Sequence, residues 1–379
     1  MSHRSRWFKQ SVVLVSLVGL PLAAQVKFQE FVENCNITSL SADGSVAVGS
    51  YGGGSTADSF RWTAAGGVEL IGVKNQFLDL YISRDGRTIV GTIPDSAGNY
   101  YAAVWQGGRN WKILPPFAGV VADDATHNVT VATGVSGDGS VIIGSAYIAQ
   151  AKIVAFRWDA VHGMVNLGTF DQGSLVDSQA LSISADGRNI VGWDFLNNFV
   201  PAGPGGAAMN SRRGAIWWDG HERLLHPFGW AGEAWVTNAV GSIIAGQFHP
   251  LDANNAPITM HGASTYLWTA WDGHFEDLGA VKIPLGGDQS NYISQPYAMS
   301  DDGSVVGGET GRFQKFAMIW TRATGMVYVS DFLTSKGVTD HLTWTLGRTV
   351  FITPDGRLMV GYGLKGLSPA VRTWIVNLK

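Results

Sequence analysis

The residues of this chain that could do chemistry lie in polar segments that mix acids, histidines and aromatic rings. The candidates are Asp123, Asp124, His127, Trp193, Trp230, Glu233, His249, Asp288, Tyr292, Asp340 and His341. Aromatic rings stack on the apolar faces of sugars and peptides, while carboxylates and imidazoles take hydrogen bonds. This combination predicts the binding of a polar ligand, a glycan or a peptide, or of a protein partner. Polar loops that only solvate a rim would have the same composition.

A catalytic role is the main alternative. Asp123 and Asp288 could serve as general acid and base of a hydrolase or lyase acting on extracellular carbohydrate, if the fold brings them within several ångströms. Such an enzyme predicts acids or histidines that converge near an axis with shifted pKa values, whereas a binding module predicts unperturbed acids. No G-x-S-x-G motif occurs, which argues against a serine hydrolase of that type. We therefore favour a non-enzymatic binding module.

Two groups of acids and histidines could also be considered as metal ligands. They are Asp123, Asp124 and His127, and His249, Asp252 and His261. Neither group has the i, i+4 helical spacing or the density of Cys and His that makes a metal motif specific. We therefore predict no metal site and no cofactor.

The polar segments alternate with copies of one short unit. Its clearest copy is S-A-D-G-R-N-I-V-G at 184–192, and similar stretches begin at Ser41, Ser83, Ser136, Ser300 and Thr353, with a worn copy at Asn238. The Gly after Asp takes φ > 0 without steric cost, and the Asp side chain caps the turn. The β-branched run after the turn predicts a strand, so each unit is a hairpin. The Gly that ends each run, such as Gly49 or Gly307, is expected to let backbones approach closely at the narrow centre of the fold.

A tryptophan follows each of the seven hairpins. The series is Trp62, Trp105, Trp158, Trp217, Trp268, Trp320 and Trp374, and a Gly turn with a further apolar segment follows the first six. Because the period of the series is that of the repeat, we interpret these rings as packing between repeats rather than as ligand platforms. Four short strands in about 40 to 60 residues are typical of a propeller blade, so the sequence predicts an all-β, seven-bladed β-propeller of four-stranded antiparallel blades.

The seventh repeat ends after its third strand, and residues 26–32 supply a candidate for the missing one. This segment alternates apolar and polar residues as an outer strand should, and its pairing with the last blade would close the ring. In this arrangement the Asp-Gly and Gly turns lie on one face of the ring. The connections that carry the candidate ligand-binding residues lie on the other, loop-rich face.

The first 24 residues resemble a secretory signal peptide and do not belong to the propeller, which we place at 25–379. Basic residues at positions 4, 6 and 9 precede an apolar run from Ser11 to Leu22 and a small-residue end. The run is short for a membrane span, and no later segment is long and apolar enough for one. We therefore expect a secreted or periplasmic protein with no membrane span after removal of the signal.

The charge of the chain bears on its partners, and its cysteine content bears on disulfide bonding. Loss of the signal removes three basic residues and no acid, so the formal charge falls from −4 to −7. A mildly acidic surface without a basic stripe argues against nucleic acid as a partner. Cys35 is the only cysteine, which excludes an internal disulfide, and we expect a buried, inert thiol. We expect a monomer.

The repeat carries a family resemblance. S-x-D-G-x-x-x-V-G, followed by Ala-Phe-x-Trp as at 155–158 and by Leu-Gly as at 167–168, resembles the HAF repeat of bacterial extracellular proteins. Thr353-Pro354-Asp355-Gly356 resembles, more distantly, the repeats of TolB-like (PD40) propellers. The resemblance covers nearly all of the chain after the signal and implies a propeller fold and export, but no defined chemistry. The fifth repeat departs most, since it lacks the Asp of its first turn.

Overall fold

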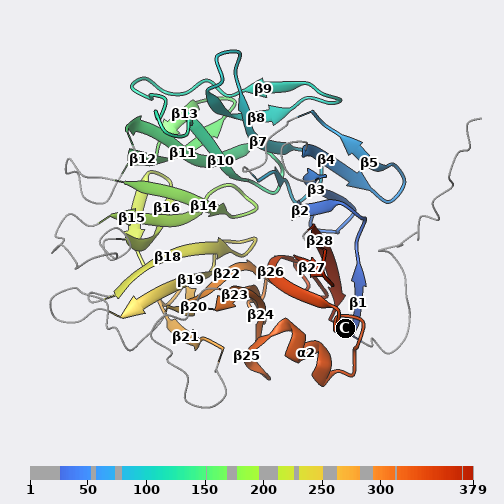
Figure 1. Ribbon diagram of the computed structural model, residues 1–379. Helices are drawn as coiled ribbons and strands as arrows, with labels where there is room; N and C mark the ends of the chain where they lie inside the picture. Colours follow the sequence, from blue (N-terminus) through green and yellow to red (C-terminus); the bar gives the residue numbers. More distant parts are fainter. Residues whose placement is uncertain are drawn as a thin grey trace, which may run out of the picture.

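The computed structural model describes 26–52, 57–72, 79–150, 152–168, 177–195, 212–225, 230–250, 263–281, 293–311, 314–368 and 370–378, without the side chains of Trp230 and Pro250. These residues form seven four-stranded antiparallel sheets arranged around a central axis (Figure 1). The chain is therefore a seven-bladed β-propeller, as the repeats predict. The signal-peptide prediction lies outside the described residues.

The first four blades follow the chain from the axis outward. Blade 1 contains β2 (Cys35–Leu40), β3 (Val46–Tyr51), β4 (Asp58–Thr63) and β5 (Gly67–Leu70). Blade 2 contains β6 (Tyr81–Ile82), β7 (Ile89–Pro94), β8 (Tyr100–Trp105) and β9 (Trp111–Ile113). Blade 3 contains β10 (Thr130–Val135), β11 (Val141–Ala149), β12 (Lys152–Asp159) and β13 (Gly163–Asn166). Blade 4 contains β14 (Ser178–Ile183), β15 (Ile190–Phe195), β16 (Arg212–Trp218) and β17 (His221–Leu224).

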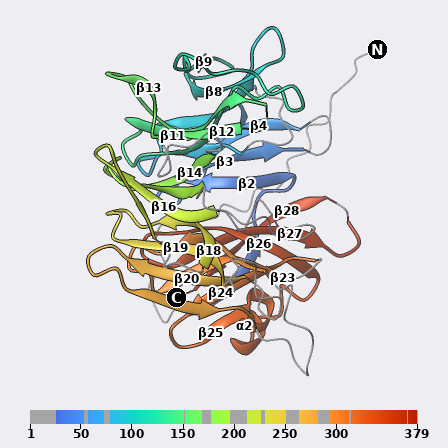
Figure 2. The same ribbon diagram turned by 90° about the vertical axis from the view of Figure 1, so that its left-hand side faces the viewer.

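The last three blades keep this order, and the ring is seen from the side in Figure 2. Blade 5 contains β18 (Trp230–Thr237), β19 (Ile243–Pro250), β20 (Ser264–Thr269) and β21 (Phe275–Gly279). Blade 6 contains β22 (Ile293–Met299), β23 (Val305–Gly311), β24 (Phe316–Thr321) and β25 (Gly325–Tyr328). Blade 7 contains β26 (Trp344–Ile352), β27 (Leu358–Lys365), β28 (Val371–Asn377) and, as its outer strand, β1 (Lys27–Glu30).

The strand β1 closes the ring, which confirms the prediction for 26–32. It pairs antiparallel with β28, with Lys27 opposite Asn377 and Glu30 opposite Trp374. The Glu30 carboxylate accepts hydrogen bonds from Lys365 at 2.7 Å and from Arg372 at 2.6 Å. The last blade is thus built from both ends of the propeller domain and is held together without a covalent link across β1 and β28.

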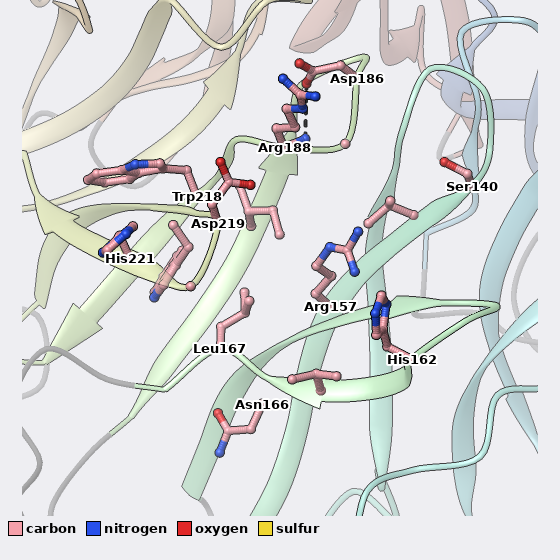
Figure 3. Close-up of a pocket in the computed structure, with 16 residues that line it drawn as sticks. Ser140, Arg157, His162, Asn166, Leu167, Asp186, Arg188, Trp218, Asp219 and His221 are labelled. Atoms are coloured by element: carbon pink, nitrogen blue, oxygen red, sulfur yellow. Dashed lines mark hydrogen bonds between the residues drawn. The ribbon is translucent and has the colours of Figure 1, made fainter.

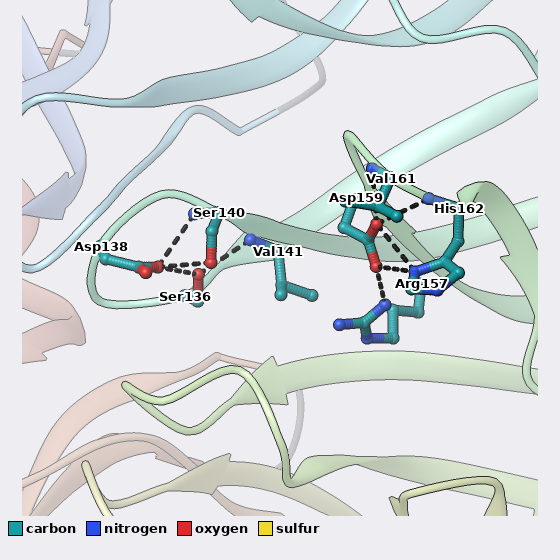
Figure 4. A network of polar contacts seen from close by, with 8 residues as sticks. All are labelled: Ser136, Asp138, Ser140, Val141, Arg157, Asp159, Val161 and His162. Carbon is teal, nitrogen blue, oxygen red and sulfur yellow. Dashed lines mark hydrogen bonds and ion pairs between the residues drawn. The ribbon is translucent and has the colours of Figure 1, made fainter.

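The Ser-x-Asp-Gly turn is fixed by a small set of hydrogen bonds (Figure 4). In blade 3 the Ser136 hydroxyl donates to Asp138 at 2.8 Å, and Asp138 accepts the Ser140 N–H at 2.9 Å. The Ser136 oxygen also accepts the Val141 N–H at 2.9 Å. Hydrogen bonds from Ser140 and Ser136 hold the pKa of Asp138 below its usual value. Gly139 has φ of 78°, which explains why glycine follows the acid.

The fifth turn keeps the same geometry without the acid. The Asn238 Oδ1 accepts the N–H groups of Ser242 at 2.8 Å and Ile243 at 3.1 Å. One amide oxygen therefore does the work of both the Ser oxygen and the Asp carboxylate, and Gly241 retains its positive φ. The predicted hairpin exists despite the missing Asp.

A β-bulge in the first strand explains the glycine at the end of the run in blade 1 and in blades 3 to 7. In blade 1 the register shifts between Ile37 and Ser39, and a Cβ on Gly49 would lie 2.0 Å from the carbonyl oxygen of Asn36. The close approach of backbones is thus confirmed between the first two strands of one blade. In blade 6 the equivalent glycine is Gly308 rather than Gly307, because it is Gly308 whose Cβ would meet a first-strand carbonyl, that of Gln295, at 1.9 Å.

The tryptophan series packs between blades, as predicted. Trp217 of blade 4 lies in one core cluster with Val141 and Ile143 of blade 3, and Trp374 of blade 7 lies in one with Ile319 of blade 6. Five of the seven rings are at most 8% exposed. Each ring therefore packs between its own blade and the preceding one, and this packing covers the ring.

Three smaller features complete the fold. A short helix that the sequence analysis did not predict, α2 (Val329–Ser335), lies in the connection from blade 6 to blade 7 and buries Phe332 and Leu333. Among the described residues, no helix has the length and apolar character needed to cross a membrane. The Cys35 thiol is fully buried, as expected, and burial raises its pKa to about 12.

The closing strand yields a first prediction. Phe28 is 6% exposed and packs against Trp344 and Trp374, with ring centroids at 5.5 and 6.4 Å. We expect Phe28→Ala to lower the free energy of unfolding by about 3 kcal/mol, because it leaves a cavity in the last blade. Urea unfolding followed by tryptophan fluorescence measures the change. The neighbouring exposed Lys27→Ala is the control and should alter stability by less than about 0.5 kcal/mol; equal effects would contradict the assigned register.

Candidate functional site

The best-defined group of polar residues lies on the two innermost strands of blades 4 to 7. Each pair of these residues has the same place in its repeat. In blade 4, for example, the turn begins at Ser184, and the pair is Gln179, five residues before Ser184, with Trp193, nine residues after it. We call these residues of blades 4 to 7 the axial crown: Gln179 and Trp193, Glu233 and Gln247, Gln295 and Glu309, and Arg348 and Tyr362. In blades 1 and 3 the same pairs are small, Asn36 with Ser50 and Val131 with Ser145. One side of the axis is therefore much richer in charge and aromatic rings.

An ion pair between blades 4 and 5 orders one half of the crown. Arg212 of β16 donates to Glu233 of β18, and its guanidinium stacks 3.9 Å from the centroid of Trp193. The Trp193 indole N–H donates to Gln179 at 3.2 Å. Glu233 is 3% exposed, and burial raises its pKa although Arg212 opposes the shift.

His249 lies beside this half of the crown on β19. Its Nε2 is 3.2 Å from the Gln247 amide nitrogen, and burial lowers the pKa of the imidazole to about 4. The ring is therefore neutral at physiological pH. A neutral imidazole next to a buried ion pair can exchange hydrogen bonds with an uncharged ligand.

The other half of the crown surrounds Arg348 of β26. Its Nε donates to Glu309 of β23 at 2.7 Å, and its guanidinium lies 4.0 Å from the ring centroid of Tyr297 and 5.7 Å from that of Tyr362. Tyr297 also contacts Trp235 of blade 5, with ring centroids 5.3 Å apart. The guanidinium is thus fixed by two rings and one carboxylate, and its Nη1 and Nη2 have no hydrogen-bond acceptor within the described residues.

Asp79 of blade 2 faces this group across the axis. Blades 2 and 7 are separated by blade 1, yet Asp79 interacts electrostatically with Arg348 and with Tyr81. The carboxylate keeps solvent contact while protein surrounds it on most sides, and this burial raises its pKa although Arg348 opposes the shift. Asp79 is exposed to solvent and has no hydrogen bond to the described residues.

A second ion pair bridges the axis at the turn face. Arg84 of the second Asp-Gly turn donates through Nη1 and Nη2 to both oxygens of Asp301 in the sixth turn, at 3.2 and 2.6 Å. Blades 2 and 6 are not neighbours, so this pair spans the centre of the ring. A cavity of about 130 Å³ lies next to it and is also lined by Tyr297.

Backbone hydrogen bonds link neighbouring turns around this pair. The Ala42 N–H donates to Arg84 O at 2.9 Å, the Gly137 N–H to Ala185 O at 2.9 Å, and the Asp301 N–H to Pro354 O at 2.9 Å. The turns thus form a narrow collar that leaves little open space on the turn face.

The structure brings three of the predicted ligand-binding residues together. Trp193 and Glu233 both contact Arg212, and His249 lies on the strand that pairs with that of Glu233. Asp123 is buried and caps its own loop through the Thr126 N–H at 2.9 Å. The structure does not place it with the crown.

The remaining predicted residues lie apart or are not described. Asp124, His127 and Asp340 are exposed on connections between blades. His341 is 2% exposed and packs near Phe28, with its Nε2 3.2 Å from the Thr334 hydroxyl. Asp288, Tyr292 and the side chain of Trp230 lie outside the described residues, so the proposed acid pair of Asp123 with Asp288 stays a prediction.

Most crown residues and two of their neighbours were missed by reasoning from loop composition. The crown residues are Gln179, Gln247, Gln295, Glu309, Arg348 and Tyr362, and the neighbours are Asp79 and Tyr297. The usable signal was the repeat register, because reading the same two positions in every repeat shows bulky polar residues only in blades 4 to 7. Within the described part of the chain, no three His, Cys, Asp or Glu side chains are grouped closely enough to hold a metal ion.

The fold and the axial site define a seven-bladed β-propeller closed by its N-terminal strand. No family model and no curated protein matches the chain. Among solved structures it is similar to the β-propeller domain of the Trilobed protease from Pyrococcus furiosus, at 10% identity over 92% of this chain and 95% of that one, with a TM-score of 0.52. An oligogalacturonate lyase in complex with manganese aligns at 12% identity over 94% and 92%, with a TM-score of 0.51.

A TolB from Acinetobacter baumannii is also similar, at 13% identity and a TM-score of 0.43. The alignment covers 70% of this chain and 57% of TolB. At such identities the comparisons establish the fold alone, so the resemblance to HAF repeats stays a prediction and the function must be argued from the site.

The buried imidazole predicts a pH dependence. His249 has a lowered pKa in the folded state, so only the unfolded chain takes up its proton as the pH falls from about 6.5 to 4. Stability is therefore retained above pH 6.5 and is lost below it, by about 2 kcal/mol for a partly buried ring. We expect His249→Gln to remove this loss in urea unfolding at pH 7.5 and 4.5. His221→Gln, at an exposed position, is the control, and parallel pH profiles of His249→Gln and the wild type would contradict the prediction.

The Arg84–Asp301 ion pair predicts that Arg84 contributes to stability and that Arg87, in the same turn, does not. We expect Arg84→Met to lower the free energy of unfolding by about 1 kcal/mol, because it removes a bidentate charged hydrogen bond between distant blades. Arg87→Met lies in the same turn, where the side chain is 86% exposed, and should have almost no effect. Chemical unfolding of both variants measures the difference, and equal values would show that the bridge does not stabilise the ring.

Proposed function

We propose that this chain is an exported, non-enzymatic binding module that takes a polar ligand, a glycan or a peptide, or part of a protein partner, through its loop-rich face. Export rests on the resemblance of residues 1–24 to a signal peptide. The axial crown carries the proposal. Its partly exposed members are Gln179, Gln295, Arg348 and Tyr362. They offer amide and guanidinium hydrogen-bonding groups next to an aromatic ring, the combination that polar ligands with apolar faces require.

The charges of the crown favour an uncharged or weakly charged ligand. Arg212 is paired with Glu233, and Arg348 is paired with Glu309. Each carboxylate offsets the charge of its guanidinium, so the crown does not favour an anionic ligand. Asp79 adds a carboxylate on the opposite side. Such a site selects by the direction of its hydrogen bonds rather than by net charge.

The direction of entry follows from the other end of the axis. The Arg84–Asp301 pair bridges the turn face, and the collar of turns surrounds it. A ligand therefore enters from the loop-rich face and meets Asp79, Tyr297 and Arg348 from that side. An end or a side branch of a longer molecule suits such a site better than a chain that threads the ring.

A specific observation favours a second candidate function, a hydrolase or lyase acting on extracellular carbohydrate. Glu233 has a raised pKa and His249 a lowered one, and shifted groups near an axis are typical of catalytic sites. We favour binding because Glu233 is already engaged by Arg212 and is almost fully covered. A general acid needs access to the atom that it protonates.

Titration with glycans, peptidoglycan fragments and short peptides tests the proposal. We expect saturable binding of at least one ligand, recovered intact, and at least a tenfold loss of affinity in Asp79→Asn, which keeps the shape of the side chain and removes its charge. Asp124→Asn and Asp340→Asn, at exposed positions between blades, are matched charge controls. A loss of affinity in these two variants and not in Asp79→Asn would indicate that the ligand binds at the rim and not at the axis.

Product analysis on every hit separates the two candidates. Conversion of a carbohydrate by the wild type, abolished in Glu233→Gln with the fold retained, would establish the enzyme and overturn the binding module. The absence of binding across the whole panel would leave a protein partner as the ligand, which capture with the wild type and Asp79→Asn as paired baits would then test.

A further inference from the structure

A second concave site lies between blades 3 and 4, away from the axial crown (Figure 3). Its cavity has a volume of about 700 Å³, within the range of small-molecule sites. Blade 3 contributes Arg157 and His162, and blade 4 contributes Arg188, Trp218 and other residues of its two turns. The cavity therefore opens near the turn face, opposite the mouth proposed for the axial site.

One position of the repeat places a polar side chain at this cavity. The residue before the tryptophan of the series is Ile216 in blade 4, Leu267 in blade 5 and Ile319 in blade 6, and each is at most 7% exposed in the core shared with the next blade. In blade 3 this residue is Arg157, whose guanidinium turns to Asp159 instead of filling the interface. Blade 3 therefore has an arginine that lines the cavity where blades 4 to 6 have a buried aliphatic side chain.

Asp159 holds two side chains in place at this wall (Figure 4). It accepts a hydrogen bond from Arg157, and His162 Nδ1 lies 3.0 Å from both of its oxygens. Its carboxylate also accepts the N–H groups of Val161 at 2.9 Å and His162 at 2.8 Å. Although burial acts in the opposite direction, these hydrogen bonds hold the pKa of Asp159 well below its usual value. Asp159 therefore orients both side chains at this wall.

The opposite wall combines planar polar groups with apolar surface. Figure 3 shows Asp219 and His221 across the cavity from Arg157, with Leu167 between them. Val165, 44% exposed, adds a further apolar surface to the lining. The cavity thus offers hydrogen-bonding edges around an apolar floor.

The acids at the cavity outnumber the guanidinium groups by one. Arg157 is paired with Asp159, and Arg188 interacts electrostatically with Asp186 of its own turn. Asp219 adds a further acid to the lining. The cavity therefore has no net positive charge that would attract an anion, and it suits a neutral molecule with many hydroxyl groups and an apolar face.

From this geometry we infer that the cleft between blades 3 and 4 is a binding site for a neutral saccharide. Hydroxyl groups of a sugar would bind the guanidinium of Arg157, the imidazole of His162 and the carboxylate of Asp219. The C–H face of the ring would pack on Val165 and Leu167. This site is separate from the axial site, and it stands whether or not the axial site binds a ligand.

Calorimetric titration of the purified protein with cellohexaose, chitohexaose, maltohexaose and laminarihexaose tests this inference, with hexagalacturonate as the acidic comparison. We expect at least one neutral hexaose to bind, and Arg157→Leu to weaken its binding at least tenfold. Leucine stands at this position in blade 5, and Asp159 keeps its hydrogen bonds from the Val161 and His162 N–H groups in this variant. The thermal midpoint is measured alongside binding, and an unchanged midpoint shows that a loss of binding is not a loss of folding.

Arg61→Leu is the matched control, because Arg61 stands before Trp62 in blade 1 within the same Phe-Arg-Trp triplet. It should bind the hexaose as the wild type does. The inference is overturned if no neutral hexaose binds, if hexagalacturonate binds more tightly, or if Arg157→Leu binds unchanged. If Asp79→Asn abolishes binding of the hexaose and Arg157→Leu does not, the hexaose binds at the axial site. This result would support the proposed function and overturn the inference of a site in the cleft.

Discussion

The turn between the first and second strands is the element on which the rest of the ring depends. Its Asp oxygen accepts an N–H two residues ahead, and its Ser oxygen accepts one five residues ahead, so the two innermost strands leave the turn in a fixed register. The glycine opposite the bulge then brings these strands close enough for one carbonyl to fill the place of a side chain. Every axial residue inherits its position from this register. In blade 5 an Asn alone reproduces it, so the constraint is the pattern of acceptors and not the identity of the acid.

The repeats made the fold predictable. Six Asp-Gly turns, a seventh turn without the acid and seven tryptophans, together with the alternating pattern of residues 26–32, predict the blades, their number and the closing strand, and the structure confirms all three. These features are local, because each depends on residues within one hairpin or on one strand pair. The helix α2 was missed because it is short and lies in a connection that lacks the repeat pattern.

The site was less accessible to the same reasoning. Loop composition pointed to Trp193, Glu233 and His249, which the structure brings together, but not to Arg348 or Asp79, which interact electrostatically although they belong to blades 7 and 2. A single sequence carries no direct signal for such a contact between distant repeats. The bulge adds a further difficulty, since an extra residue in the first strand changes which side chains share a face.

The closure of the ring also determines how the molecule responds to mechanical force. The first residue of β1, Lys27, pairs with Asn377 at the end of β28, so the segments before and after the propeller leave it at the same end of an antiparallel pair. A pull on these two segments loads the hydrogen bonds one after another, as in opening a zipper, and not all together in shear. Tension between the two ends would therefore peel β1 away first and leave the last blade with three strands, while Thr373 still holds blade 7 to blade 1.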